Sequence, residues 1–248
     1  MEVEDSPEVS AANVKFLRGF PGWAPPYTSS MATARVIRPR WAGAVLALLL
    51  PFAAAGCKDA EKYPWMIVPG VRVGPIPLNV SESELRAKFG DEVRPQLYDL
   101  GEGEYLPGAV LFPADTLKRI EIAWRDTVAR REIKTVRIEG YSSVWRLESR
   151  VQLGTDLLEL ERLNGRPFKL AGFGWDQQGV VLSWEEGSLL SGMKGVYVYL
   201  TPDPKKMSSE AYRRVSGDRE FMSDDGDMRL MDPRVGRIVV AFDIAAPR

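Results

Sequence analysis

Residues 76–90 read IPLNVSESELRAKFG, and residues 151–165 read VQLGTDLLELERLNG. The two segments align without a gap at an offset of 75 residues. The alignment pairs identical residues at four positions: Leu78 with Leu153, Glu84 with Glu159, Leu85 with Leu160 and Gly90 with Gly165. Self-similarity at a fixed period predicts an internal repeat, and this repeat decides the fold that we expect.

Each segment carries the signals of a short helix. Ser81 followed by Glu84 is the pattern of a capping box, and Asp156 followed by Glu159 is its acidic counterpart. The glycine that closes each segment supplies the left-handed residue that ends a helix. Because a helix of about two turns is not stable alone, we expect each one to pack through its apolar residues onto a sheet.

Strand-like segments follow each predicted helix. Ile120, Ile122 and Trp124 alternate with Arg119 and Glu121, as in a half-buried strand. The strands that we expect are 109–112, 119–124 and 135–138 after the first helix, and 168–173, 180–184, 195–200 and 237–242 after the second, with a further helix near 206–215. We therefore predict an α+β fold of two tandem repeats, 71–145 and 146–248, each a short capped helix followed by an antiparallel β-meander.

This pattern resembles the β-lactamase-inhibitor-like fold. That group includes tandem-repeat inhibitor proteins and the SmpA/OmlA-type lipoproteins of the outer-membrane assembly machinery. The second segment also looks like uncharacterised bacterial lipoproteins with the same helix, stop and strand order. The resemblance covers residues 71–242, and the first segment departs from it at Asn79 and Glu92, where glycine and proline are usual. It implies a fold and an envelope setting, and no particular activity.

The N-terminal region has the composition of an export signal. Residues 1–30 mix acids with glycine, proline and serine, and we expect them to be a disordered extension ahead of a start at Met31. Three arginines and the uncharged run WAGAVLALLLPFAAA follow, so we predict a signal peptide over residues 31–56. The uncharged run is shorter than the roughly 20 residues that cross a bilayer.

The end of this signal resembles the lipobox of bacterial lipoproteins. It reads Ala54-Ala55-Gly56-Cys57, with alanine where leucine is usual at the first position. The resemblance implies cleavage between Gly56 and Cys57, lipidation of Cys57 and a tether over residues 57–70. Lys58 follows the cysteine, whereas in enteric bacteria an aspartate at this position of a lipoprotein favours retention in the inner membrane. We therefore expect the anchored protein to lie at the periplasmic face of the outer membrane. A plain cleaved signal and an uncleaved anchor are the alternatives.

Composition excludes several kinds of chemistry. The 248 residues include no histidine and one cysteine, which rules out Ser-His-Asp and Cys-His catalysis, an internal disulfide and a cysteine-cluster metal site. With 33 basic and 34 acidic residues, the chain has no general electrostatic attraction to nucleic acid. We expect no cofactor, no metal and no nucleic-acid partner.

Three local motifs suggest chemistry but favour structural roles. The acidic run 223–227 lacks the distal glutamate of a calcium loop, so we expect Asp224 or Asp225 to cap a helical turn. The acidic pairs Glu185–Glu186 and Asp224–Asp227 could in principle act in acid–base catalysis. Acidic residues are abundant on protein surfaces, and nothing in the sequence brings either pair together in a cleft. The glycine-rich segment 172–175 lacks the lysine and serine of a phosphate loop and predicts a twisted hairpin.

Aromatic residues are the strongest candidates for a binding surface. If Val196 and Val198 face the core, Tyr197 and Tyr199 are exposed on the sheet, where Trp175 would join them as a partner surface. We therefore expect a non-catalytic, lipid-anchored envelope protein that binds a protein or other envelope component through a sheet. A carboxylate-only cell-wall hydrolase and a carrier of lipid or small ligands remain as alternatives.

Overall fold

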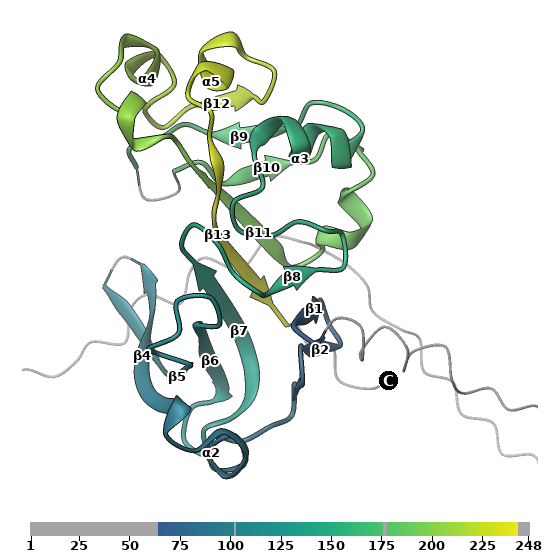
Figure 1. Cartoon of the computed structure of the whole chain (residues 1–248), viewed down its shortest axis with the longest axis vertical. Coiled ribbons are helices and arrows are strands. Elements are labelled where there is room, and N and C mark those ends of the chain that lie inside the picture. Colours follow the sequence, from purple (N-terminus) through teal and green to yellow (C-terminus); the bar gives the residue numbers. More distant parts are fainter. Residues whose placement is uncertain (1–63, 102, 176–177, 243–248) are drawn as a thin grey trace, which may run out of the picture. The chain divides into compact units, whose positions relative to one another are not determined.

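A six-stranded antiparallel sheet is the main element of the fold. The computed structural model describes residues 64–101, 103–175 and 178–242. Four consecutive strands form a meander: β4 (Val93–Gly101), β5 (Glu104–Leu111), β6 (Ile120–Asp126) and β7 (Arg131–Glu139). Two strands from later in the chain complete the sheet in the order β11-β13-β7-β6-β5-β4: β11 (Val196–Thr201) and β13 (Arg234–Ala241). Figure 1 shows β13 running between β11 and β7.

Two smaller sheets accompany the large one. The first has the order β3-β2-β1-β8 and consists of β1 (Met66–Val68), β2 (Arg72–Val73), β3 (Ile76–Pro77) and β8 (Arg146–Leu147). The second has the order β10-β9-β12 and consists of β9 (Lys169–Ala171), β10 (Val181–Ser183) and β12 (Glu220–Met222). Strand β1 pairs with β8 in parallel, which ties the start of the described chain to its middle.

The helices are short. The α-helices are α2 (Glu82–Phe89), α3 (Leu157–Asn164), α4 (Glu210–Arg214) and α5 (Gly226–Leu230). Single 3₁₀ turns occur at η1 (Gly90–Glu92), η2 (Leu190–Met193) and η3 (Pro204–Lys206). No helix among these described segments is long and apolar enough to cross a bilayer.

The two predicted helix starts are confirmed. The Ser81 hydroxyl accepts a hydrogen bond from the Glu84 N–H at 3.2 Å, and the Glu84 carboxylate accepts one from the Ser81 N–H at 2.8 Å. Asp156 accepts one from the Glu159 N–H at 2.8 Å. Each cap therefore satisfies a backbone donor that has no partner inside the helix.

The mixed α+β class is confirmed, but the tandem repeat is not. The strands after α2 form one meander, whereas those after α3 divide between the three-stranded sheet and the six-stranded sheet. Strand β13 pairs with β7, placing Ile238 opposite Ile138 and Val240 opposite Val136. All four of these side chains are buried, so the two halves of the sequence share one sheet face.

One predicted boundary and one strand differ from the structure. Strand β1 lies inside the expected tether 57–70, because Ile67 is fully buried in the core and the Trp65 ring packs edge-on against Trp145. The prediction also missed β4, which contains Pro95. This strand is terminal among the described strands, and Pro95 sits at a position that donates no hydrogen bond to β5, where a proline is tolerated.

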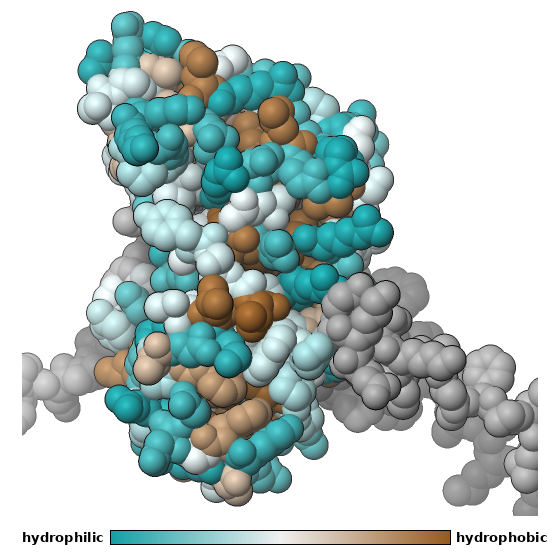
Figure 2. Space-filling view, in the orientation of Figure 1, coloured by the Kyte–Doolittle hydropathy of each residue, from teal (hydrophilic) through white to brown (hydrophobic). Residues whose placement is uncertain are grey.

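One hydrophobic cluster joins both halves of the described chain. Its largest fully buried side chains are Trp124, Trp145, Phe168, Phe173 and Phe242. Gly74 is required beside Trp145, because it has a φ of +55° and a Cβ there would lie 2.7 Å from the indole ring. On the face drawn in Figure 2, hydrophobic residues form small groups separated by charged and polar residues.

Candidate functional site

The outer face of the six-stranded sheet forms a cleft of about 770 Å³. Strands β4, β7, β11 and β13 provide its floor, and the start of β10 provides one wall. The lining residues are Tyr98, Asp99, Leu100, Gly101, Glu104, Thr135, Arg137, Val180, Val181, Leu182, Tyr197, Tyr199, Arg237, Val239 and Ala241. Its volume lies within the range of small-molecule sites.

Alternation along the strands decides which side chains face the cleft. Val196 and Val198 are buried in the core, so their neighbours Tyr197 and Tyr199 point to the other face, as the sequence predicts. The register places Tyr197 opposite Val239, and Val239 opposite Arg137. Cleft residues from distant parts of the chain therefore form continuous rows across the sheet.

Arg137 lies at the centre of the floor. Its guanidinium packs over the Tyr98 ring, 4.5 Å from the centroid, and its Nη1 donates to the Asp99 carbonyl oxygen at 3.0 Å. Its Nε donates to Glu121 Oε2 at 3.0 Å. The side chain is only 16% exposed. Arg137 is thus fixed on three sides and holds the end of β4 against β7.

Glu121 is the carboxylate that balances this arginine. Arg119 donates to Glu121 Oε1 at 2.6 Å, and Gln96 donates to the same oxygen at 3.2 Å. Burial alone would raise the pKa of Glu121, but the hydrogen bonds from Arg137 and Arg119 outweigh it and hold this pKa below its usual value. Burial also raises the pKa of Tyr98 to about 12, against the opposing effect of Arg137.

A second arginine–tyrosine pair lies beside the first. The Arg237 guanidinium packs over the Tyr199 ring at 5.3 Å from the centroid, and Glu139 pairs with Arg237. Burial raises the pKa of Tyr199, with Arg237 opposing the effect. Arg237 is 43% exposed, against 16% for Arg137, so it offers the cleft more of its side chain.

The remaining cleft residues combine an aromatic ring with polar groups and an apolar wall. Tyr197 is 49% exposed and faces the cleft beside Leu182, which is 42% exposed. Within the described ranges, no hydrogen bond uses the hydroxyls of Thr135, Tyr98, Tyr197 or Tyr199. The cleft therefore offers stacking, donor and acceptor groups to a ligand.

The structure brings together some of the predicted surface residues and separates others. Tyr197 is exposed as expected, while Tyr199 is half-buried because Arg237 covers its ring. Trp175 is 61% exposed but does not line the cleft, and its indole nitrogen lies near Gly217 instead. Cys57 and Gly56, with the rest of the predicted signal peptide and residues 1–30, lie outside the described residues.

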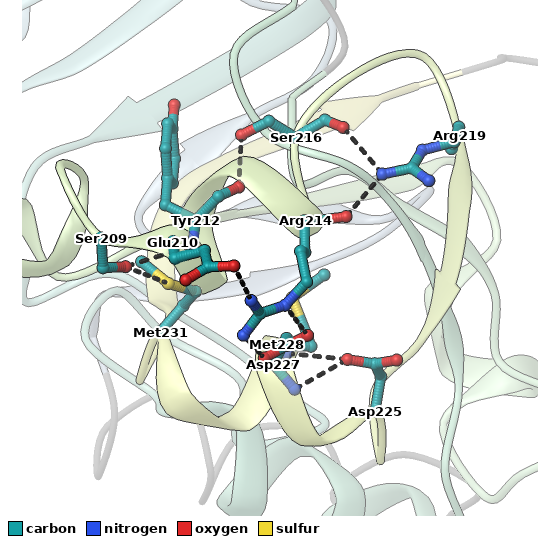
Figure 3. Close-up of polar contacts among 10 residues, drawn as sticks. All are labelled: Ser209, Glu210, Tyr212, Arg214, Ser216, Arg219, Asp225, Asp227, Met228 and Met231. Carbon is teal, nitrogen blue, oxygen red and sulfur yellow. Dashed lines mark hydrogen bonds and ion pairs between the residues drawn. The ribbon is translucent and has the colours of Figure 1, made fainter.

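The acidic run 223–227 has a structural role in the described chain. Asp225 caps α5, accepting hydrogen bonds from the N–H groups of Asp227 and Met228 at 2.8 and 3.0 Å, which confirms the predicted cap. Figure 3 shows Arg214 between Asp227 and Glu210. Arg214 holds Asp227 through two hydrogen bonds of 2.6 and 2.7 Å, which lower the pKa of that carboxyl group.

Glu185 and Glu186 form a strained turn. Both have a left-handed backbone, with φ of 50° and 59°, and the Gly187 N–H donates to the Trp184 carbonyl oxygen at 2.9 Å. Asn164 Nδ2 donates to the same oxygen at 2.9 Å, so the end of α3 holds the turn in place. Non-glycine residues rarely adopt this conformation. The two side chains do not line the cleft.

A smaller hollow of about 390 Å³ lies where β7 and β11 end and β13 begins. Gly140, Gly154 and Gly236 contribute to its lining, together with Pro202 and Pro204. Tyr141, Thr201, Asp203, Asp232 and Arg234 also line it. The cleft has about twice its volume and more polar side chains, which makes the cleft the better candidate site. Across residues 64–101, 103–175 and 178–242, no three carboxylate or cysteine side chains gather closely enough to hold a metal ion.

Sequence reasoning missed the residues that build the cleft floor. Arg137 lies in a stretch of mixed charges that gives no sign of a site, yet its side chain is mostly buried over Tyr98. The sequence did contain a signal that Glu121 and Arg137 lie on the face away from the core. Each sits between two buried apolar residues of a strand. Their meeting depends on the pairing of β6 with β7, which a strand pattern alone does not specify.

Comparison of the chain with family models, with curated proteins and with solved structures found no match in any of the three.

Proposed function

We propose that this protein is a non-catalytic, lipid-anchored protein of the bacterial envelope that binds another envelope component through the cleft. The cleft on the outer face of the six-stranded sheet is the observation that carries the binding part of the proposal. An exposed tyrosine, Tyr197, sits there beside a rigid floor in which two arginines are already held in place. Preorganised floors of this kind lower the entropy lost on binding.

The anchor is proposed from the sequence. The basic stretch, the short apolar run and the sequence Ala54-Ala55-Gly56-Cys57 support lipidation of Cys57. Several acyl chains hold a protein at a membrane where one is marginal. Mass spectrometry of the mature N-terminus tests this part: a diacylated Cys57 is expected, and an intact Met1 or Met31 would overturn it.

We also propose that α2 and α3 descend from one duplicated helix–strand unit, as the resemblance to β-lactamase-inhibitor-like proteins implies. The gapless alignment of residues 76–90 with 151–165 supports this, as do the equivalent caps at Ser81 and Asp156. In this proposal, the strands after α3 diverged when β11 and β13 joined the sheet of the first unit.

Site-specific photo-cross-linking tests the binding part of the proposal. A photoreactive amino acid at Leu182 places the reactive group in the cleft and leaves Tyr197 intact. The matched control position is Leu158 on α3, an exposed leucine that does not line the cleft. In intact cells we expect an adduct from position 182 that is lost in a Tyr197→Ala background and is not formed from position 158. Equal adducts from both positions would contradict the proposal.

A carboxylate-only hydrolase is the second candidate, because Asp99 and Glu104 both line the cleft. Asp99 Oδ1 accepts a hydrogen bond from the Gly101 N–H at 2.8 Å. This function predicts that the full chain releases soluble fragments from purified cell-wall polymer, and that Asp99→Asn and Glu104→Gln abolish the release. If the wild-type chain releases no fragments, the hydrolase function is contradicted.

A further inference from the structure

We infer that the cleft binds a neutral oligosaccharide segment, with Tyr197 as the stacking platform; this inference rests on the proposed binding function of the cleft. Four observations carry it: the balance of charge in the lining, the use of side chains rather than backbone, the hydroxyl groups without a protein partner, and the exposed ring.

The lining has no net charge. Arg137 and Arg237 contribute two positive charges, and Asp99 and Glu104 contribute two negative charges. The ion-pair partners behind the lining, Arg119, Glu121 and Glu139, add one positive and two negative charges, so the site as a whole stays close to neutral. Sites for phosphate groups or nucleic acid concentrate positive charge, and sites for cationic peptides concentrate negative charge. A balanced lining fits a ligand that is polar but uncharged.

The floor recognises its ligand through side chains alone. Strands β7 and β13 are interior strands, so their backbone N–H and C=O groups are used by neighbouring strands on both sides. A peptide that adds as a strand needs a free edge, and the two strands that carry Arg137 and Arg237 have none. The ligand must therefore present closely spaced donor and acceptor groups to side chains.

The unpaired hydroxyls match this requirement. Within the described ranges, the hydroxyls of Thr135, Tyr197 and Tyr199 make no hydrogen bond to protein, and Glu104 has no ion-pair partner. A hydroxyl group both donates and accepts, as does each hydroxyl of a sugar. Arg237, 43% exposed, adds donors beside them.

Tyr197 completes the site. Its ring is 49% exposed, whereas the rings of Tyr98 and Tyr199 are covered by arginines. The C–H groups on one face of a sugar ring carry partial positive charge and pack against the negative face of an aromatic ring. Val239 is the cross-strand partner of Tyr197 and Leu182 lines the same cleft, so both add apolar surface to the site.

Calorimetric titration of the full chain tests the inference, in a detergent without a sugar headgroup. The probes are tetra-N-acetylchitotetraose and cellotetraose, with tetraglutamate and inorganic phosphate as charged comparators. We expect at least one tetrasaccharide to bind with a dissociation constant at or below about 1 mM, and neither charged probe to bind. Tyr197→Ala should weaken that binding at least about tenfold, and Thr135→Val should weaken it less.

Tyr105→Ala is the matched control, because Tyr105 is 55% exposed and does not line the cleft. We expect its affinity to stay within about twofold of the wild type. Absence of tetrasaccharide binding by a chain with a native circular dichroism spectrum would overturn the inference, as would equal losses in the two tyrosine variants. Tetraglutamate binding that depends on Tyr197 would overturn it in favour of an acidic peptide.

The outcome separates this inference from the proposed function. If position 182 forms a Tyr197-dependent cross-link in cells while no tetrasaccharide binds, the inference fails and the binding function stands. If position 182 forms no such cross-link and no tetrasaccharide binds, both fail.

Discussion

Glu121 is the residue on which the cleft floor depends most. It accepts hydrogen bonds from Arg137, Arg119 and Gln96, and its side chain is only 13% exposed. Losing its charge removes the nearer of the two carboxylates that pair with Arg137. The arginine would then keep only the Asp99 carbonyl oxygen, the Tyr98 ring and the more distant Glu139.

We expect Glu121→Gln to lower the free energy of unfolding by about 2 kcal/mol at pH 7, because a half-buried charged hydrogen bond is lost. The folded-state pKa of Glu121 is held below its usual value. Its contribution is therefore present above the unfolded-state pKa of about 4.3 and is lost as the pH falls through the folded-state pKa. Urea titrations should show that the free energy of unfolding changes less between pH 7 and pH 3 in the variant than in the wild type. An equal pH dependence in both proteins would contradict the account.

The turn at Glu185 and Glu186 stores backbone strain. Two consecutive left-handed residues are typical of Asn-Gly or Gly-Gly turns rather than of two glutamates. We expect Glu186→Gly to raise the free energy of unfolding by about 1 kcal/mol, because glycine adopts a positive φ without a steric penalty. Thermal unfolding of this variant and of Glu186→Ala separates the causes. Equal stabilisation by alanine would assign the effect to the lost side chain instead.

At the scale of the element, the capped helices are the features that the sequence predicts best. Helix α3 is short, and its Leu157 and Leu160 are buried while Asp156 satisfies the Glu159 N–H. Because short helices depend on their caps and on packing, the cap residue should matter measurably. Similar reasoning applies to Ser81 at α2.

We expect Asp156→Ala to lower the free energy of unfolding by about 1 kcal/mol, because a backbone donor in the first turn loses its partner. Asp156→Asn keeps an acceptor oxygen in the same place and should stay close to the wild type. Chemical denaturation of both variants measures the effect. If asparagine costs as much as alanine, the charge of Asp156 and not the cap is responsible.

Sheets are less predictable than caps in this chain. The patterns of β6, β7, β11 and β13 are visible because buried and more exposed residues alternate, and only the apolar end of β5 is visible, as a continuous run. Strand β4 is hidden by Pro95 and by exposed residues along its length. The short strands β1, β2, β3 and β8 hold two or three residues each, too few for a period to be recognised.

At the scale of the whole molecule, the two halves of the sequence build one sheet and one core. Strand β13 lies between β11 and β7, and Phe242, Ile67 and Trp145 belong to one hydrophobic cluster. Sequence periodicity predicts two similar units but does not say whether they share strands. Only the long-range pairing of β13 with β7 reveals that they do.

We expect the two halves to be unable to fold separately. A fragment of residues 64–145 would expose the Ile138 side of β7, and a fragment of residues 146–242 would expose the Ile238 side of β13. Circular dichroism should show no cooperative thermal transition for either fragment, and one transition for the full chain. A cooperative transition in an isolated half would contradict the shared core.

The candidate site was predictable only in part. Tyr197 follows from the alternation of β11, since its valine neighbours face the core. The Tyr98–Arg137 and Tyr199–Arg237 pairs bring together residues from strands whose pairing the sequence does not specify. Trp175 was predicted to join Tyr197 on one surface. It is exposed and close in sequence to the cleft wall, but it does not line the cleft.

The central claim is that the cleft is the binding surface of this protein. Its most direct test is the yield of the cross-link from position 182 in cells that carry Arg237→Met, compared with cells that carry the wild-type cleft. Methionine keeps an unbranched side chain over Tyr199 but removes the charge and its donors. We predict a yield at least about tenfold lower in the variant, with unchanged protein level. An unchanged yield would contradict the account.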